Sequence, residues 1–483
     1  MISHEERIRG PILVLPCVLF CTLAGNGLGG ESDRAGSRGQ FGLLLPGQFV
    51  HIPGPNPILL PGAAGAWDDG VIEAADAFRD GAVYYFYYHG TGQGKGYRLG
   101  VATASAPLGP FRKHGDRPIL DLGPPGSWDD QGVACAMVVP EGPGKYWMWY
   151  SGIGASPAHA KWSVGLATAP HPLGPWQKFA GNPILKDFGY VGGVVRAGGK
   201  YHLYTAHPIG STGPDYSPMS LATADSPSGP WTRYAENPVL QEGPSGEWDD
   251  GGFSEAEVFH DGGMFHIFYG GAKIHPERIR TRESIGYAFS RDGRHFQKHP
   301  QNPVAPREAN PNAAAFAEVH AIYEPPFVFL YHTLRYIEPR TSADTPRFPA
   351  VENLGVQVLA LSRPFRLDMP LIHQEALGPK TMTPLAEAAA INLTGVREVS
   401  LKLTCTYGSK ATSRVRIHVL PSDDGIGWRS SDAQRLEVDF QPAQTIRQTL
   451  RLNAKSKFIK VLLENTDASQ RVSALDAVAT IGG

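Results

Sequence analysis

Carboxylates stand near the start of three segments that have the aromatic-rich character of β-strands. Glu73 lies in the first segment, Glu255 in the second, and Glu318 and His320 in the third. Paired carboxylates can donate a proton to a leaving group and stabilise the positive charge that develops opposite it. Side chains two residues apart on a strand point the same way, so we expect Glu318 and His320 to act as a pair, in which the imidazole donates a proton near neutral pH. We predict that these four residues are catalytic.

A comparison of two of these segments separates the catalytic candidates from acids that recur. In an ungapped match Asp76 falls on Glu257, whereas Glu73 falls on a serine and Glu255 on an alanine. A site is built once per molecule and a structural device is repeated, so uniqueness favours Glu73 and Glu255 as catalysts. For Asp76 and Glu257 we predict a binding role, with strand construction as the alternative. Any of these acids could instead be satisfied by neighbouring backbone N–H groups.

The phrase Trp-Asp-Asp occurs three times, at 67–69, 128–130 and 248–250. Three copies favour a structural role, in which the tryptophan packs between strands and the aspartates cap a turn. If one copy reaches the site, Asp69 or Asp250 is the expected substrate contact.

Two histidines and an arginine complete the candidates for substrate binding. His89 and His332 end or follow aromatic-rich strands, and Arg335 comes three residues after His332. A buried, hydrogen-bonded imidazole is the alternative for either histidine. No cluster with the spacing of metal ligands is present, and no metal site is predicted.

The strands that position these residues belong to a repeat. An Asn/Arg-Pro-Ile/Val element recurs every 55 to 65 residues, at positions 56, 117, 182, 237 and 302. Upstream of the last four copies lie a Gly-Pro-aromatic element or its variant and, further upstream, an Ala-Thr-Ala-type strand. Each unit supplies about four short strands separated by Gly and Pro. Radial repetition of four-stranded sheets predicts a five-bladed β-propeller, since solenoid repeats are shorter.

Changes in composition and strand pattern along the sequence also predict the domain boundaries. Residues 50–372 form the propeller, 373–390 a linker, and 391–483 a small β-sandwich of alternating strands. Residues 1–30 are predicted to be a signal peptide, because arginines precede a short apolar run and small residues follow it. Residues 31–49 are predicted to be a flexible segment. The protein is therefore expected to be secreted or periplasmic. Lipidation at Cys21 is the alternative, although small residues do not precede it.

The bulk composition excludes several classes of partner. The formal net charge is −2 and no Lys/Arg run stands out, so nucleic acid is not expected as a partner. The apolar run of the signal is too short to span a bilayer, and no membrane association is expected after its removal. Cys135 and Cys405 remain after the signal and lie far apart, so no disulfide is predicted.

The order of the repeated elements resembles the five-bladed propellers of glycoside hydrolase families 43, 32, 117 and 130, over about two thirds of the chain. The resemblance implies a central funnel in which acidic residues at the start of the inner strands cleave glycosidic bonds. It implies an exo-acting enzyme that removes terminal furanosides or anhydro-sugars from plant or algal polysaccharides. A structural calcium ion, as some relatives hold, is the one cofactor that it suggests.

The sequence departs from family 43 in two ways. The phrases around Glu73 and Glu255 lack the proline that follows the acid in that family, and the acids fall on blades one, four and five instead of the first three. This favours family 117 or an unassigned relative. Two other functions remain open: a propeller that binds carbohydrate without catalysis, and a phosphorylase that uses Arg196 and Arg335 to hold phosphate.

Overall fold

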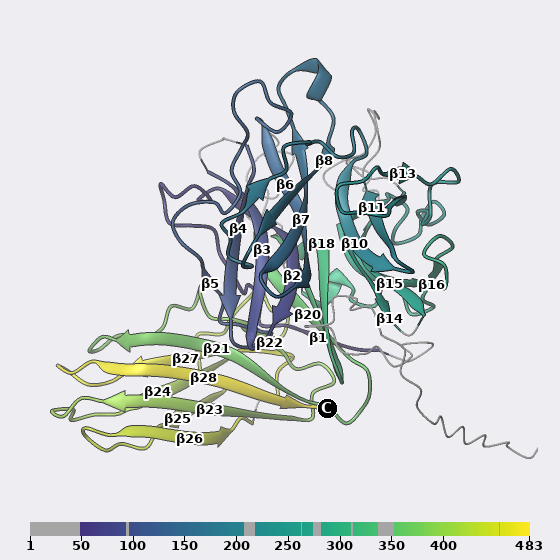
Figure 1. The fold of residues 1–483 in the computed structure, drawn as a ribbon. Coiled ribbons are helices and arrows are strands. Elements are labelled where there is room, and N and C mark those ends of the chain that lie inside the picture. The colour runs from purple at the N-terminus through teal and green to yellow at the C-terminus, as the bar shows by residue number, and fades with distance from the viewer. Residues whose placement is uncertain are drawn as a thin grey trace, which may run out of the picture. The chain divides into compact units, whose positions relative to one another are not determined.

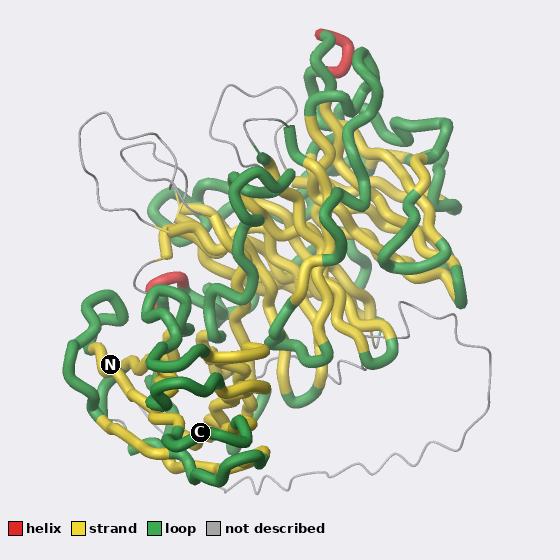
Figure 2. The backbone as a smooth tube through the Cα atoms, turned by 90° about the vertical axis from the view of Figure 1, so that its left-hand side faces the viewer, coloured by secondary structure: helices red, strands yellow, loops and turns green. Residues whose placement is uncertain are grey.

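The computed structural model describes residues 49–92, 96–206, 218–261, 263–273, 282–310, 313–336, 352–453 and 455–483. The segment predicted to be a signal peptide lies outside them. Within these ranges the strands form seven antiparallel four-stranded sheets, and the helices are two single turns, η1 (Pro157–His159) and η2 (Arg307–Ala309) (Figures 1 and 2). None of the described helices is long and apolar enough to cross a membrane.

Five of the sheets are the blades of the propeller, which confirms the predicted fold. In blades one to four the order of the strands in the sheet follows the chain, from an inner to an outer strand. Blade one is β2 (Val71–Asp80), β3 (Val83–Thr91), β4 (Arg98–Ala104) and β5 (Arg112–Lys113). Blade two is β6 (Gly132–Gly142), β7 (Lys145–Ile153), β8 (Ser163–Ala169) and β9 (Gln177–Lys178). Blade three is β10 (Tyr190–Ala197), β11 (Lys200–Ala206), β12 (Ser220–Ala224) and β13 (Thr232–Arg233).

The last two blades complete the ring. Blade four is β14 (Phe253–Asp261), β15 (Met264–Lys273), β16 (Arg282–Ser290) and β17 (Gln297–Lys298). Blade five is β18 (Ala313–Glu324), β19 (Phe327–Tyr336) and β20 (Glu352–Ala360), with β1 (Val50–Pro53) as its outer strand. The strand that precedes blade one in the chain therefore closes blade five, where Val50 pairs with Ala360.

The recurring Asn-Pro element fastens the third strand of its own blade. The Asn182 side chain accepts a hydrogen bond from the Leu166 backbone N–H at 2.8 Å and donates to the Leu166 carbonyl at 2.9 Å. Asn237 makes the same pair of bonds to Leu221. The asparagine of the repeat thus has a structural role, because its side chain binds both the N–H and the carbonyl of one residue in the third strand.

Each inner strand carries an irregularity near its start. The pairing register with the second strand shifts between residues 74 and 76, 134 and 137, 191 and 193, 253 and 256, and 317 and 320. In two of these bulges a residue other than glycine has a left-handed backbone, namely Cys135 and Glu318, both with φ 47°. Bulges re-aim side chains, and residues held in this region of backbone space cluster at functional sites.

The remaining two sheets form the C-terminal sandwich. One contains β21 (Arg366–Leu377), β28 (Val472–Gly482), β23 (Glu398–Tyr407) and β26 (Thr445–Arg451). The other contains β22 (Ala390–Asn392), β27 (Phe458–Asn465), β24 (Val415–Ser422) and β25 (Gln434–Glu437). Along β23 buried and more exposed residues alternate, as expected for a sheet with one face in the core.

The boundary between propeller and sandwich lies earlier than the sequence suggested. β21 pairs with β28 along its length, from Arg366 with Gly482 to Leu377 with Val472. Residues 366–372, assigned to the propeller, and 373–377, assigned to the linker, therefore belong to the sandwich. The Gly-Pro pair at 378–379, which led to the linker assignment, follows the strand. Cys135 and Cys405 are both buried free thiols.

Candidate active site at the start of the inner strands

A single buried arginine, at the end of β19, lies among four glutamates. The Arg335 guanidinium contacts Glu318 at 2.7 Å, Glu352 at 2.8 Å, Glu283 at 2.9 Å and Glu73 at 3.1 Å. The side chains of all five residues are at most 7% exposed. We call these five residues the Arg335 cluster. Four carboxylates around one cation leave an excess of negative charge at low dielectric, which favours protonation of at least one of them.

Glu318 is a member of the cluster whose charged form is disfavoured. Burial raises the pKa of its carboxyl well above the usual range, and although Arg335 opposes this, Glu73, Glu255 and Glu283 add to it. Its backbone N–H donates to Ser254 Oγ at 3.1 Å, which holds the bulge in place. A carboxyl that stays protonated near neutral pH can act as a general acid.

Glu73 shares the contact with Arg335 but differs from Glu318 in having an imidazole beside it. His89 Nε2 lies 2.8 Å from one carboxylate oxygen, and the Arg335 guanidinium lies 3.1 Å from the other. A cation and an imidazole both favour the ionised carboxylate. The predicted substrate contact His89 is 2% exposed and is engaged by Glu73. We therefore assign His89 to positioning Glu73.

Glu255 receives a hydrogen bond from a residue that the sequence did not single out. The thiol of Cys135 on blade two donates to Glu255 Oε1 at 2.6 Å. Burial raises the pKa of Glu255, while the Cys135 hydrogen bond and the nearby His89 lower it. Burial also raises the pKa of the Cys135 thiol well above its usual value, so the thiol keeps the proton that it donates.

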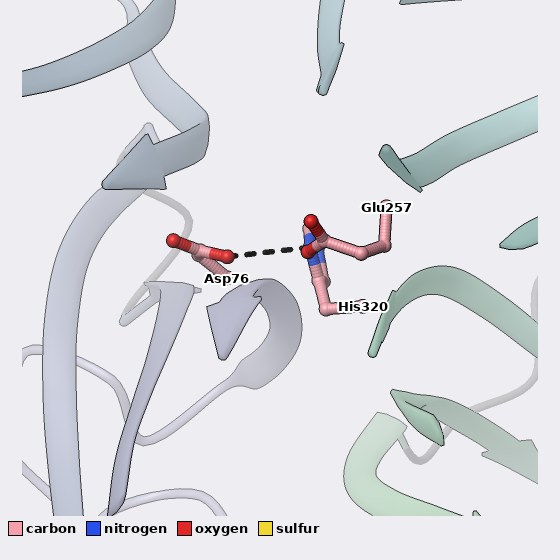
Figure 3. A group of neighbouring side chains, drawn as sticks. All are labelled: Asp76, Glu257 and His320. Atoms are coloured by element: carbon pink, nitrogen blue, oxygen red, sulfur yellow. Dashed lines mark ion pairs between the residues drawn. The ribbon is translucent and has the colours of Figure 1, made fainter. Parts of the chain in front are cut away.

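The predicted pair of Glu318 and His320 does not form. The bulge between Ala317 and His320 breaks the alternation of the strand, so Glu318 joins the Arg335 cluster while His320 joins a second group. His320 Nδ1 lies 3.8 Å from both Asp76 Oδ1 and Glu257 Oε2 (Figure 3). The expectation failed because it assumed a regular strand.

This second group, Asp76, Glu257 and His320, is more deeply buried than the Arg335 cluster. The three residues are at most 1% exposed, which is incompatible with the direct substrate contact predicted for the two acids. Figure 3 shows the three side chains pointing toward one another from different strands. Asp76 also accepts from the backbone N–H of Val138 on blade two at 2.7 Å, so it ties two blades together.

The geometry of this group resembles a metal site, but not a calcium site. Its three ligand atoms lie within 4.8 Å of one another. Calcium takes about six to eight oxygen ligands, whereas this group offers two carboxylates and an imidazole nitrogen, a set that suits zinc-like ions better. This group by itself therefore does not match the oxygen-rich coordination of calcium, and the calcium ion that the resemblance implies stays a prediction. No local pattern in the sequence indicates the group, because its members come from three blades.

The Trp-Asp-Asp phrases lie in turns. The second aspartate of each phrase accepts a hydrogen bond from the backbone N–H four residues earlier: Asp69 from Gly65 at 2.6 Å, Asp130 from Gly126 at 2.7 Å and Asp250 from Gly246 at 2.8 Å. The first aspartate pairs with a lysine from the outer strand of its blade, as Lys113 does with Asp68 at 2.5 Å. All three Trp-Asp-Asp copies therefore have the structural role. This includes Asp69 and Asp250, which were the expected substrate contacts.

His332 is also a buried, hydrogen-bonded imidazole, which was the alternative to substrate binding. Its ring bonds to the Thr333 carbonyl at 3.0 Å and to the Gln357 side chain at 3.1 Å, and the residue is fully buried. Burial lowers its pKa to about 3, so the ring stays neutral. It is a packing residue of blade five and not the substrate contact that its place in the sequence suggested.

Three residues of the site were not predicted from the sequence: Cys135, Glu283 and Glu352. Glu283 and Glu352 stand at the start of third strands, in β16 and β20, whereas the prediction considered inner strands only. Cys135 occupies the position in the blade-two bulge that Glu318 occupies in blade five. A search for polar residues at that one repeat position, without restriction to acids, would have found it.

Comparison with known proteins gives structural likeness without sequence-level relatives. No family model matches the sequence, and no curated protein does. Solved structures are similar to it at low identity. One is a thermostable family 43 glycoside hydrolase, which is 17% identical, with a TM-score of 0.44 over 63% of this chain and 91% of that one.

Two further solved structures are named as glycoside hydrolases. The family 117 enzyme Zg3597 of the marine bacterium Zobellia galactanivorans is 16% identical, with a TM-score of 0.42 over 66% of this chain and 92% of that one. The family 32 β-fructofuranosidase of Bombyx mori is 12% identical, with a TM-score of 0.44 over 89% of this chain and 93% of that one.

Proposed function

We propose that this protein is a glycoside hydrolase that removes terminal sugars from polysaccharide chains. The observation that carries the proposal is the Arg335 cluster, in which Glu318, a carboxyl with a raised pKa, lies beside Glu73, a carboxyl that contacts both Arg335 and His89. Glycoside cleavage needs this combination, because the leaving oxygen must gain a proton while the oxocarbenium ion needs an opposing carboxylate or activated water.

The environments of the three acids support distinct roles. Glu318 is the general acid that protonates the leaving oxygen. Glu73, held by His89 and Arg335, is the carboxylate that faces the sugar as nucleophile or base. Glu255 is the further carboxylate of the site, held by Cys135. Glu318 thus takes a main role, where the sequence suggested an auxiliary one.

The proposal is tested by incubating the protein with a panel of plant and algal oligosaccharides and separating the products by chromatography. We expect release of one monosaccharide from chain ends, and loss of that product in Glu255→Gln. Glu141→Gln is a matched control. Glu141 lies at the C-terminal end of β6, outside the site, where its carboxylate accepts a hydrogen bond from the Trp147 indole N–H. Wild-type turnover by Glu255→Gln would contradict the assignment of Glu255.

Removal of the Cys135 thiol is expected to shift the acid limb of the pH–rate profile to higher pH. The thiol hydrogen bond lowers the pKa of Glu255, so Cys135→Ala raises that pKa, and the ionised form appears only at higher pH. Cys135→Ser keeps a donor and should restore the wild-type profile. Coincident profiles for the wild type and Cys135→Ala would show that the thiol does not act on a titrating group of the reaction.

The substrate class and the location follow from the resemblance and the sequence. We propose furanosides or anhydro-sugars of plant or algal polysaccharides as substrates, and export as the route by which the enzyme reaches them, as the apolar N-terminal run suggests. Phosphorolysis has less support. Arg335 is already engaged by four carboxylates, and Arg196 stacks 5.7 Å from the ring of Tyr201.

Carbohydrate binding without turnover is the second candidate function. The observation that favours it is the burial of the three proposed catalytic glutamates. Glu73, Glu255 and Glu318 are each only 5% exposed. Saturable binding of one oligosaccharide with no product after long incubation would support this function and exclude hydrolysis of that sugar.

A further inference from the structure

A cavity of about 290 Å³ lies where the end of β1 and the start of β20 meet the sandwich. Its walls include Leu60, Asn353, Asn392, Trp428, Phe458 and Lys460. The volume is near the lower end of the range of about 300–1,000 Å³ that is usual for small-molecule sites. None of the described residues that line it is acidic.

Asn353 is the residue that marks the cavity as a binding site. It is 4% exposed, and its side-chain Oδ1 has no hydrogen-bond partner within the described part of the chain. Leaving a buried polar atom without a partner costs about 1–3 kcal/mol, so such an atom in a cavity wall indicates a polar ligand. Asn392 is fixed nearby, since its amide donates to the Ala309 carbonyl at 3.1 Å and accepts from the Thr394 N–H at 2.8 Å.

Aromatic and cationic groups form another part of the wall. Trp428 and Phe458 both line the cavity, and Lys460 Nζ lies 5.0 Å from the centre of the Trp428 ring. The same ammonium donates to the Leu385 carbonyl at 2.9 Å, which leaves two of its three protons for other acceptors. Leu60, which also lines the cavity, is 49% exposed, a large fraction for such a side chain.

These features together define the chemistry of the ligand. An aromatic wall beside amide groups suits a sugar ring, which has an apolar face and hydroxyls at its edge. A lysine with no acid in the described wall favours a negative charge on that sugar. We propose that this cavity is a second carbohydrate site, which binds a uronate unit of an acidic polysaccharide.

The second site is distinct from the Arg335 cluster but shares a strand with it. Glu352 pairs with Arg335 in the sheet and Asn353 pairs with Leu334. Successive side chains on a strand point to opposite faces, so Glu352 contacts the guanidinium while Asn353 lines the cavity. The proposed site therefore rests on the proposed function only in taking the same class of ligand, a carbohydrate.

This site is tested by isothermal titration calorimetry of the full chain. The ligands are oligogalacturonate and a neutral oligosaccharide of equal length. We expect binding of the acidic chain, at least tenfold weaker in Trp428→Ala and in Lys460→Met, and weaker binding of the neutral chain by the wild type. Trp147→Ala is the control, because Trp147 bonds to Glu141 on blade two and does not line the cavity.

The outcomes separate the second site from the active site. Equal binding by the wild type, Trp428→Ala and Lys460→Met would overturn the proposal, and so would equal affinity for the neutral chain. Absence of sugar release by the wild type would count against the proposed hydrolase and leave the titration unaffected. Circular dichroism of each variant excludes unfolding as the reason for lost binding.

Discussion

Glu318→Gln is expected to lower the rate of sugar release by about 10²–10⁴-fold, the usual contribution of a general acid. Glutamine has the shape of the protonated carboxyl, so its amide can remain beside Arg335, but it has no proton to transfer. Steady-state kinetics on the substrate found in the panel measures the loss. Glu324→Gln is the matched control, because Glu324 ends the same strand and pairs with Arg79 outside the cluster.

The same variant changes the pH dependence of stability. Because the pKa of Glu318 is raised in the folded protein, its contribution to stability is fully present below the unfolded pKa of about 4.3 and is lost as pH rises through the folded pKa. Glu318→Gln should remove this loss, so its unfolding midpoint in urea should fall less than that of the wild type toward alkaline pH. Wild-type activity with an unchanged stability profile would exclude Glu318 as the acid.

Arg335→Met is expected to destabilise the protein by about 3–5 kcal/mol, the cost of breaking a buried ion pair from one side. Four buried carboxylates would lose the guanidinium that contacts all of them. Urea unfolding at pH 7, followed by fluorescence, measures the change. Arg79→Met, which removes a partly exposed partner of Glu324, should cost about 1 kcal/mol or less.

A second substitution distinguishes charge from lost packing in that experiment. If excess negative charge causes the instability, Glu352→Gln in the Arg335→Met background should recover part of the loss, because it removes one of the four acids. An equal or larger loss in the double variant would indicate that packing of the arginine stem dominates.

The sequence was sufficient to predict the propeller because its signals are local and repeated. Each Asn-Pro element bonds within its own blade, as Asn182 does with Leu166, so the repeat in the sequence corresponds to a repeat in space. The sandwich was also predicted, but the Gly-Pro pair that suggested a linker follows a strand, β21, that already belongs to it.

The site was predicted only in part because it is assembled from residues that no local pattern connects. Glu73, Glu318 and Arg335 were named from the sequence, and the structure brings them together. Their grouping could not be predicted, because it depends on bulges that change which way a side chain points. His320 shows this most clearly: two residues from Glu318, it lies with Asp76 and Glu257 instead.

The closure of blade five by β1 has a consequence for the timing of folding. Residues 50–53 leave the ribosome about 300 residues before their partner strand β20. At a synthesis rate of about 5–20 residues per second, β1 waits roughly 15–60 s before it can pair. During that interval four blades can form, but the ring stays open and exposes an unpaired strand edge, which is a site of aggregation. A chaperone that holds the N-terminal segment would therefore act most usefully while the last blade is being made.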